Sequence, residues 1–317
     1  MPTAHKHILA SVFCFCVSMA LALGQVQSGP NRTSDASKSQ NAAATANAEA
    51  GSWFKARKVA DGVWCIEDHG SDNIYLVEGK EKALLIDTGL GVAKLNDFVK
   101  TLTRLPVIVV NTHGHPDHAG GNHQFKSVYA HPLEFAAIRQ TSTAESRKRA
   151  AENMMRGATA ADMVSIEEAV KMPAAELLPL KDRQVFDLGG RKIEVIETPG
   201  HTPGEIVLLD SANRIAFTGD NDNALVWLFL PTCMPLEVYL QSLKKLQQRD
   251  GEFDTIMPGH GLPLPKSFVG EQVTCVERIL DGTCKGDPYK SFAGDALVCR
   301  YKSAAVAFDP NNLRVKK

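Results

Sequence analysis

Residues 111–122 have the sequence NTHGHPDHAGGN, which places His113, His115 and His118 around Asp117 within a few positions. The whole chain has ten histidines, so three in one short stretch is a concentration that needs a chemical cause. Crowded imidazole rings repel one another when protonated, and a bound cation removes that repulsion by accepting their lone pairs. The stretch therefore predicts a metal site, for which other parts of the chain must supply the remaining ligands.

Further side chains of metal-ligand type follow short apolar runs elsewhere in the chain. LPVIVV (105–110) leads into the histidine-rich stretch, and IEVIET (193–198), RIAFT (214–218) and TIM (255–257) lead to His201, Asp220 and His260. Short runs rich in β-branched residues and stopped by Gly or Pro are typical of buried strands. Loops just past several strand ends can direct their side chains to a common point, so these ligands are expected to meet at one sheet edge.

Helical patterns lie between these runs. Residues 133–176, rich in Ala, Glu, Arg and Met, predict helices with breaks, and residues 235–249 predict an amphipathic helix. Asp117 is expected to cap a helix that begins at His118, because a carboxylate there can accept free backbone N–H groups. Residues 59–89 alternate in the manner of a three-stranded meander. Strands and helices are therefore interspersed, with antiparallel pairing early and crossovers later.

The first 24 residues (1–24) have the three regions of a secretory signal peptide. Lys6 precedes a long apolar run, and the small residues Ala20, Ala22 and Gly24 fit a cleavage site after Gly24 or Ala22. A membrane anchor is the alternative, but the run is short for one and ends in small residues. The sequence thus predicts an exported protein, secreted or periplasmic, with no stable membrane anchor after cleavage.

The rest of the chain divides into a linker and one domain. Residues 25–52 are polar, small and aperiodic, as in a flexible linker. The domain is expected over residues 53–317, including a short C-terminal extension over about 266–317. Its formal net charge of -1 and lack of a basic block exclude an electrostatic nucleic-acid partner. A small-molecule substrate is expected instead, and the oligomeric state stays open.

The cysteines predict one disulfide. Of seven cysteines, the leader contains Cys14 and Cys16, which leaves Cys65, Cys233, Cys275, Cys284 and Cys299. An odd number leaves at least one thiol free if bridges form within one chain. Cys284 and Cys299 are the preferred pair, because a loop of about 15 residues corresponds to roughly 3 kcal/mol of chain entropy. Cys275 remains the competing partner.

Five motifs, taken in order, carry a resemblance to a known family. IDTG (86–89), THGHPDH (112–118), TPGH (198–201), TGD (218–220) and PGH (258–260) resemble the metallo-β-lactamase-fold hydrolase superfamily. The resemblance covers roughly residues 53–265. It implies a fold of class α+β, a four-layer αββα sandwich in which two mixed sheets lie face to face with helices outside.

The resemblance also implies which side chains hold metal. The first zinc ion would be held by His113, His115 and His201, the second by Asp117, His118 and His260, and one oxygen of Asp220 would bridge both. Imidazole and carboxylate ligands with an open position independently suit a catalytic zinc. Asp87 would support the loop without touching metal.

The expected activity is hydrolysis of a small ester, thioester, lactone or amide. A hydroxide shared by two zinc ions would attack the carbonyl, while Asp117 orients it and carries its proton. β-Lactamases of the superfamily usually have Cys or Ser at the position that matches Asp220. An Asp at this position is similar to the thioesterases, lactonases and phosphodiesterases of the superfamily. A β-lactamase and a non-catalytic zinc-binding protein remain the alternatives. Trp227 and Phe229 are expected either to line an apolar substrate groove or to belong to the core.

Overall fold

The computed structural model describes residues 52–154 and 163–316. The predicted signal peptide (1–24) and the predicted linker up to residue 51 lie outside the described residues. Within the described ranges, no helix has both the length and the apolar character needed to cross a membrane.

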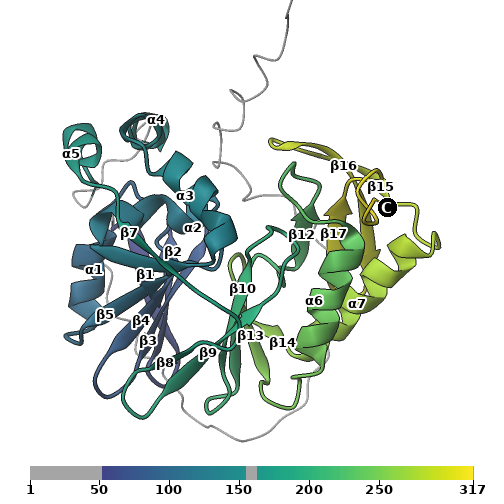
Figure 1. Cartoon of the computed structure of the whole chain (residues 1–317), viewed down its shortest axis with the longest axis horizontal. Coiled ribbons are helices and arrows are strands. Elements are labelled where there is room, and N and C mark those ends of the chain that lie inside the picture. The colour runs from purple at the N-terminus through teal and green to yellow at the C-terminus, as the bar shows by residue number, and fades with distance from the viewer. Residues whose placement is uncertain (1–51, 155–162, 317) are drawn as a thin grey trace, which may run out of the picture.

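The first part of the described chain forms a seven-stranded mixed sheet (Figure 1). Its strands, in spatial order, are β1 (Phe54–Ala60), β2 (Val63–Asp68), β3 (Asn73–Glu78), β4 (Ala83–Ile86), β5 (Val107–Val110), β6 (Ser127–Ala130) and β7 (Glu176–Pro179). The pairs from β1 to β4 are antiparallel, and those from β4 to β7 are parallel. The predicted meander over residues 59–89 is confirmed as β2, β3 and β4, with β1 added at the edge.

A second, six-stranded sheet packs against the first. Its spatial order is β14 (Leu264–Pro265), β13 (Thr255–Pro258), β11 (Ile215–Gly219), β10 (Ile206–Asp210), β9 (Lys192–Glu197) and β8 (Val185–Asp187). β9, β11 and β13 coincide with the three later apolar runs of the sequence, so these strand predictions are confirmed. One buried cluster holds residues of both sheets, including Tyr75 and Ile86 from the first and Val195, Leu208 and Phe217 from the second.

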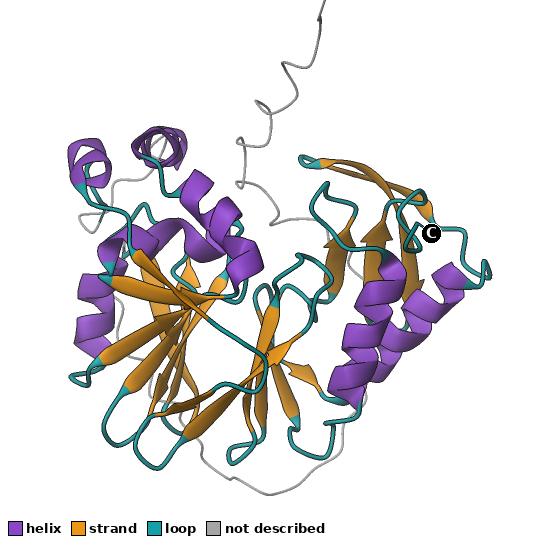
Figure 2. Cartoon of the chain, in the orientation of Figure 1, coloured by secondary structure: helices purple, strands orange, loops and turns teal. Residues whose placement is uncertain are grey.

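Helices cover the outer faces of the two sheets (Figure 2). They are α1 (Leu95–Leu102), α2 (Pro116–Ala119), α3 (Phe135–Thr141), α4 (Ala144–Met154), α5 (Ile166–Lys171), α6 (Leu236–Gln247) and α7 (Ser267–Leu280), with short 3-10 helices η1 (Gly120–Gln124) and η2 (Pro132–Glu134). Leu95 and Val99 of α1 pack on the first sheet, and Leu243 of α6 and Val276 of α7 belong to the cluster behind the second. The predicted αββα sandwich is confirmed.

The helix after the histidine-rich loop begins earlier than predicted. α2 starts at Pro116 rather than His118, and its N-cap residue is His115, which makes no capping bond through its side chain. Proline is favoured at a first helical position because its φ is already helical and its missing N–H is not needed there. The capping role predicted for Asp117 is therefore wrong, and this carboxylate lies inside the first turn.

The C-terminal segment builds a third sheet. Its order is β12 (Leu225–Leu228), β17 (Ala304–Phe308), β16 (Gly294–Tyr301) and β15 (Asp287–Ser291). β12 follows Asp220 closely in the chain and pairs in parallel with β17. The segment after residue 266 thus joins directly to the part of the chain that carries the predicted ligand.

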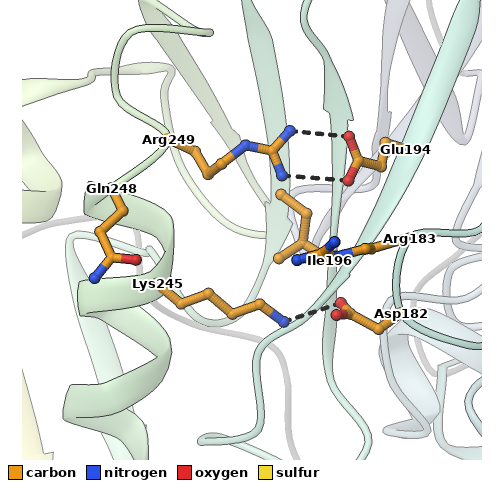
Figure 3. A pocket seen from close by; sticks show the side chains of 7 residues that line it. All are labelled: Asp182, Arg183, Glu194, Ile196, Lys245, Gln248 and Arg249. Atoms are coloured by element: carbon orange, nitrogen blue, oxygen red, sulfur yellow. Dashed lines mark hydrogen bonds and ion pairs between the residues drawn. The ribbon is translucent and has the colours of Figure 1, made fainter.

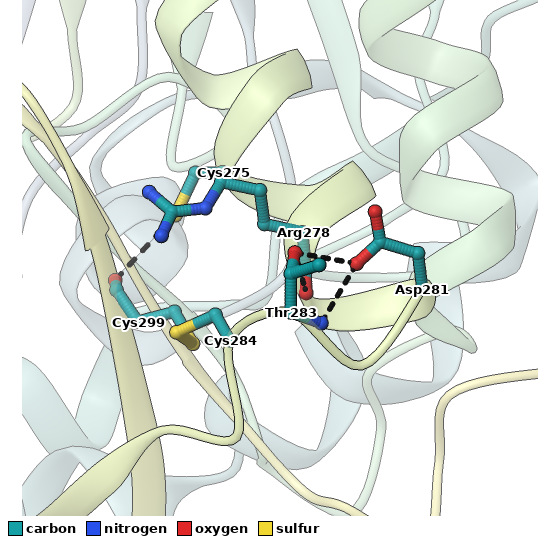
Figure 4. Close-up of a disulfide and its surroundings, with 6 residues drawn as sticks. All are labelled: Cys275, Arg278, Asp281, Thr283, Cys284 and Cys299. Carbon is teal, nitrogen blue, oxygen red and sulfur yellow. Dashed lines mark hydrogen bonds between the residues drawn. A yellow bond between two sulfur atoms is a disulfide. The ribbon is translucent and has the colours of Figure 1, made fainter.

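The predicted disulfide between Cys284 and Cys299 is present (Figure 4). It joins the turn after α7 to β16. Cys65, Cys233 and Cys275 are free and buried. Burial raises the pKa of the Cys65 and Cys275 thiols to about 11, so these thiols stay protonated and exchange poorly with the disulfide.

Reduction of this disulfide is expected to lower the free energy of unfolding by about 3 kcal/mol, because the unfolded chain regains the entropy of the open loop. The Tm should fall when reductant is added to the wild-type protein. The double variant Cys284→Ser with Cys299→Ser provides the control, since its Tm should not respond to reductant. Equal Tm values for the oxidised and reduced wild type would contradict the expectation.

Candidate metal centre

Loops and one short helix at an edge of the sandwich bring the seven predicted ligand residues together. They follow β5 (His113, His115), lie on α2 (Asp117, His118), or follow β9 (His201), β11 (Asp220) and β13 (His260). Ligand atoms lie within 4.8 Å of one another in each of three groups of these side chains. The convergence of loops past several strand ends is the arrangement expected from the sequence.

His113, His115 and His201 form the first group. Nδ1 of His115 lies 2.9 Å from Nε2 of His201, and Nε2 of His113 is buried without a hydrogen-bond partner in the described part of the chain. Burial, and after it the neighbouring imidazoles, holds the pKa of His113 well below its usual value and lowers that of His115 to about 3. Neutral rings that present lone pairs to one point are the donor set that fits a transition-metal ion.

Asp117, His118 and His260 form the second group. Nε2 of His260 lies 3.4 Å from Oδ2 of Asp117 and 3.3 Å from Nε2 of His118. Burial alone would lower the pKa of both imidazoles, but Asp220 and Asp117 outweigh it and raise both pKa values well above the usual range. The two carboxylates therefore favour positive charge at this point, and a metal ion supplies such charge when bound.

Asp220 lies between the two groups. Its Oδ1 is 3.4 Å from Nε2 of His118 and 3.3 Å from Nε2 of His260, whereas its Oδ2 is 3.4 Å from Nε2 of His201. Each oxygen thus faces a different group, which differs from the single shared oxygen that the resemblance implies. Gly259 permits this approach, because a Cβ there would lie 2.5 Å from Oδ1 of Asp220.

Three of the histidines are oriented through their second ring nitrogen. Nδ1 of His118 is 2.9 Å from Oδ2 of Asp87, and Nδ1 of His201 and His260 each lie 2.7 Å from a backbone carbonyl. Those carbonyls belong to Trp227 and Ser71. Because a carbonyl only accepts, Nδ1 of His201 and of His260 carries a proton, which leaves Nε2 as the ring atom that can bind a metal ion.

Asp87 supports the histidine-rich loop as expected. Its Oδ1 accepts the backbone N–H of Thr112 at 2.7 Å, and its Oδ2 accepts the Thr112 hydroxyl at 2.8 Å. The same carboxylate contacts His118, so one side chain holds both the loop and a ligand.

Two buried glutamates escaped the sequence prediction. Glu134 accepts the backbone N–H of Gly114 at 2.9 Å and that of Gly204 at 2.6 Å, and so joins the loops of His115 and His201. Glu205 accepts the backbone N–H of Asp220 at 2.7 Å. Neither residue belongs to a motif, because each acts on backbone groups whose position only the fold defines.

Glu134→Ala is expected to weaken metal binding 10- to 100-fold, the range typical of groups that orient metal ligands. The two loops lose their common tie, so the first group of histidines is held less firmly. Competition with a chromophoric chelator measures the affinity. Glu176→Ala, on the exposed start of β7, is the matched control and should bind as wild type does. Wild-type affinity in Glu134→Ala would show that the tie is dispensable.

A separate cavity of about 120 Å³ lies between β9 and the end of α6 (Figure 3). Its lining includes Arg249, which pairs with Glu194 at 2.9 Å, and Lys245, which pairs with Asp182 at 2.9 Å. None of its lining residues is a candidate metal ligand. These ion pairs help to hold α6 against β9, and because their charges are already paired, the cavity is not the candidate site.

Comparison with known proteins points to one family. The family model described as Metallo-beta-lactamase superfamily matches residues 68–260, which include all seven candidate ligands. Human "Acyl-coenzyme A thioesterase MBLAC2" is 28% identical over 228 residues, covering 66% of this chain and 81% of that protein. "Atrochrysone carboxyl ACP thioesterase" from Emericella nidulans is 25% identical over 206 residues, covering 63% and 55% of the two chains.

A solved structure agrees with the fold. "Metallo-beta-lactamase from Pontibacter korlensis" superposes with a TM-score of 0.53 at 21% identity, covering 71% of this chain and 99% of that one. The segment that the family model matches, residues 68–260, contains the loops that carry all seven candidate ligands. The chain therefore belongs to the metallo-β-lactamase superfamily of metallo-hydrolases.

Proposed function

We propose that the protein is a hydrolase that uses two zinc ions per chain to cleave small esters, with acyl thioesters as the preferred class. The observation that carries the proposal is the position of Asp220, whose two oxygens face two different groups of candidate ligands. Imidazole and carboxylate ligands suit zinc. The relatives named as thioesterases support thioesters over β-lactams as substrates.

The metal ions, when bound, supply Lewis acidity that polarises a carbonyl and lowers the pKa of water. The chain contributes proton transfer through Asp117, whose side chain is 24% exposed, compared with 11% for Asp220. Burial would raise the pKa of Asp117, but His118 and His260 outweigh burial and hold it below the usual value. An ionised, accessible carboxylate at this point can accept a proton and pass it to the leaving group.

A hydrolysis panel with metal analysis tests the proposal on purified residues 25–317 after zinc reconstitution. The panel comprises an acyl thioester, a chromogenic ester, a lactone and a chromogenic β-lactam. We expect about two zinc ions per chain and the highest kcat/KM for the thioester. One metal ion or none would remove the two-metal arrangement. Two metal ions without turnover of any compound would favour a non-catalytic zinc-binding role, and preference for the β-lactam would favour a β-lactamase.

We also infer that the protein is exported. The leader pattern of residues 1–24 supports this, and the disulfide between Cys284 and Cys299 suits an oxidising compartment. N-terminal sequencing of the mature protein should find Gln25 or Leu23 as the first residue. A chain that still begins at Met1 or Pro2 would contradict export with cleavage.

A further inference from the structure

Four aromatic side chains gather where β12 meets the hairpin of β15 and β16. Trp227 lies 5.3 Å from both Phe229 and Phe292, and 6.4 Å from Tyr289, between ring centroids. Nε1 of Trp227 donates to the Tyr289 hydroxyl at 3.1 Å. These four residues are called the aromatic cluster below. It combines two segments that are about 60 residues apart in the chain, as the spacing of Trp227 and Tyr289 shows.

The aromatic cluster borders the metal centre through Trp227. The backbone carbonyl of Trp227 accepts a hydrogen bond from the Nδ1–H of His201, with 2.7 Å between Nδ1 and the oxygen. Val226 and Leu228 on the alternate face of β12 are buried in the core, whereas Trp227 is only partly buried. Side chains alternate along a strand, so the Trp227 ring lies on the face of β12 that the core leaves uncovered.

The hairpin overhangs the sheet that carries it. The pairing of β16 with β17 ends at Leu297 and Phe308, whereas its pairing with β15 continues to Gly294 and Ser291. Figure 1 shows the hairpin reaching above β12. This overhang explains how β15, which is separated from β12 by the two strands β17 and β16, places Tyr289 against Trp227.

The hairpin tip leaves one aromatic ring of the cluster largely open to solvent. Phe292 is 58% exposed, although its ring packs on Trp227. Apolar area left in water is unfavourable, and contact with an apolar ligand removes that area from water. The two polar groups of the Trp227–Tyr289 pair hydrogen-bond to each other. The cluster therefore offers mainly aromatic faces, which suit an uncharged hydrocarbon group.

We propose that the aromatic cluster binds the apolar acyl chain of the substrate while the acyl carbonyl lies at the metal centre. This inference rests on the proposed hydrolase function, and it adds that the substrate carries an acyl chain of several carbons. The hydrogen bond between His201 and Trp227 keeps the cluster next to the first group of candidate ligands. Each methylene that the cluster buries is expected to raise kcat/KM roughly fourfold until the surface is covered.

A chain-length series tests the proposal in the zinc-loaded protein. Saturated acyl thioesters from acetyl to decanoyl are compared in the wild type, in Phe292→Ala and in Phe229→Ala. We expect kcat/KM to rise with chain length in the wild type. In Phe292→Ala the advantage of decanoyl over acetyl should fall about tenfold. Phe292 is exposed, so its truncation should leave the fold intact.

Two control variants separate the aromatic faces from other effects. Val185→Ala truncates an apolar side chain that is 50% exposed on β8, outside the aromatic cluster, and should keep the wild-type dependence on chain length. Tyr289→Phe keeps the ring but removes the hydrogen bond to Trp227. This variant should also keep the wild-type dependence on chain length. An unchanged chain-length dependence in both Phe292→Ala and Phe229→Ala would overturn the proposal.

Binding without turnover gives an independent measurement. Decyl and ethyl thioethers of the thiol that forms the thioester series cannot be hydrolysed. Calorimetry measures their affinities directly. The decyl compound should bind more tightly to wild type, and Phe292→Ala should reduce that preference about tenfold. No preference for decyl in wild type would overturn the acyl-chain site, whatever the turnover results. Preference for decyl without turnover of any thioester would instead contradict only the proposed hydrolase function.

Discussion

Asp220→Asn is expected to lower turnover more than about 100-fold even when zinc is saturating, beyond the range typical of groups that only orient ligands. The amide keeps the size of the side chain but removes the charge that lies between the two groups of candidate ligands. In wild type one carboxylate oxygen faces His201 and the other faces His118 and His260. The substitution replaces one of these two oxygens with an NH₂ group. Mutual repulsion of two cations is then less compensated. Turnover of the best panel substrate, measured with metal content on the same samples, gives the result.

Asp222→Asn is the matched control for this experiment. Asp222 lies two positions after Asp220 in the chain and is also buried. Neither of its carboxylate oxygens has a hydrogen-bond partner within the described residues. Burial raises its pKa to about 7, so the substitution removes less charge near neutral pH. Its turnover should stay close to that of wild type. Wild-type turnover by Asp220→Asn at full metal occupancy would exclude a catalytic role for the carboxylate between the two groups.

Removal of the metal ions by a chelator is expected to abolish turnover and to leave the fold in place. The candidate ligands lie on loops and on the short helix α2, whereas the buried clusters of the sheets contain none of them. Zinc that binds only the folded protein should stabilise it by about 4 kcal/mol per site at 1,000 times its Kd. Far-UV circular dichroism, Tm and turnover before and after zinc is restored measure the three effects.

Zinc affinity should also rise with pH. In the metal-free protein, burial opposes protonation of His118 and His260, but Asp220 and Asp117 raise both pKa values well above the usual range. Protons compete with metal for these imidazoles below the raised pKa values, and the competition ends as pH increases through them. Chelator competition on either side of neutral pH measures this dependence.

For the metal-removal experiment, chelated protein that unfolds, or that keeps its turnover, would contradict the expected separation of fold and metal centre.

The residues that follow strands were predictable because their signals are local. A short β-branched run ended by Gly or Pro marks a strand and its loop, and His201, Asp220 and His260 each follow such a run. Imidazole and carboxylate are ligand types that suit a transition metal, so several of them placed just after strands predict a metal site. The disulfide was predictable on similar grounds, since Cys284 and Cys299 close a short loop.

Local signals failed where two equally local preferences competed. The carboxylate of Asp117 favoured a helix that begins after it, but Pro116 is pre-organised for the first helical position and the helix begins there. Asp117 is consequently free to face His260 instead of the helix N-terminus. A shift of two residues at a helix start thus decides which way a candidate catalytic side chain points.

The sequence by itself determined the strands that precede the candidate ligands, because residue type and periodicity carry that information. Its five motifs carried the resemblance that implied the family and the set of candidate ligands. Only the tertiary structure decided that Glu134 joins two ligand loops, and that the Trp227 carbonyl orients His201. It also decided that β12 pairs with β17 and that the distant Tyr289 reaches Trp227. Backbone groups are the same in every residue, and pairing between distant segments depends on how the whole chain folds, so neither leaves a pattern in the local sequence.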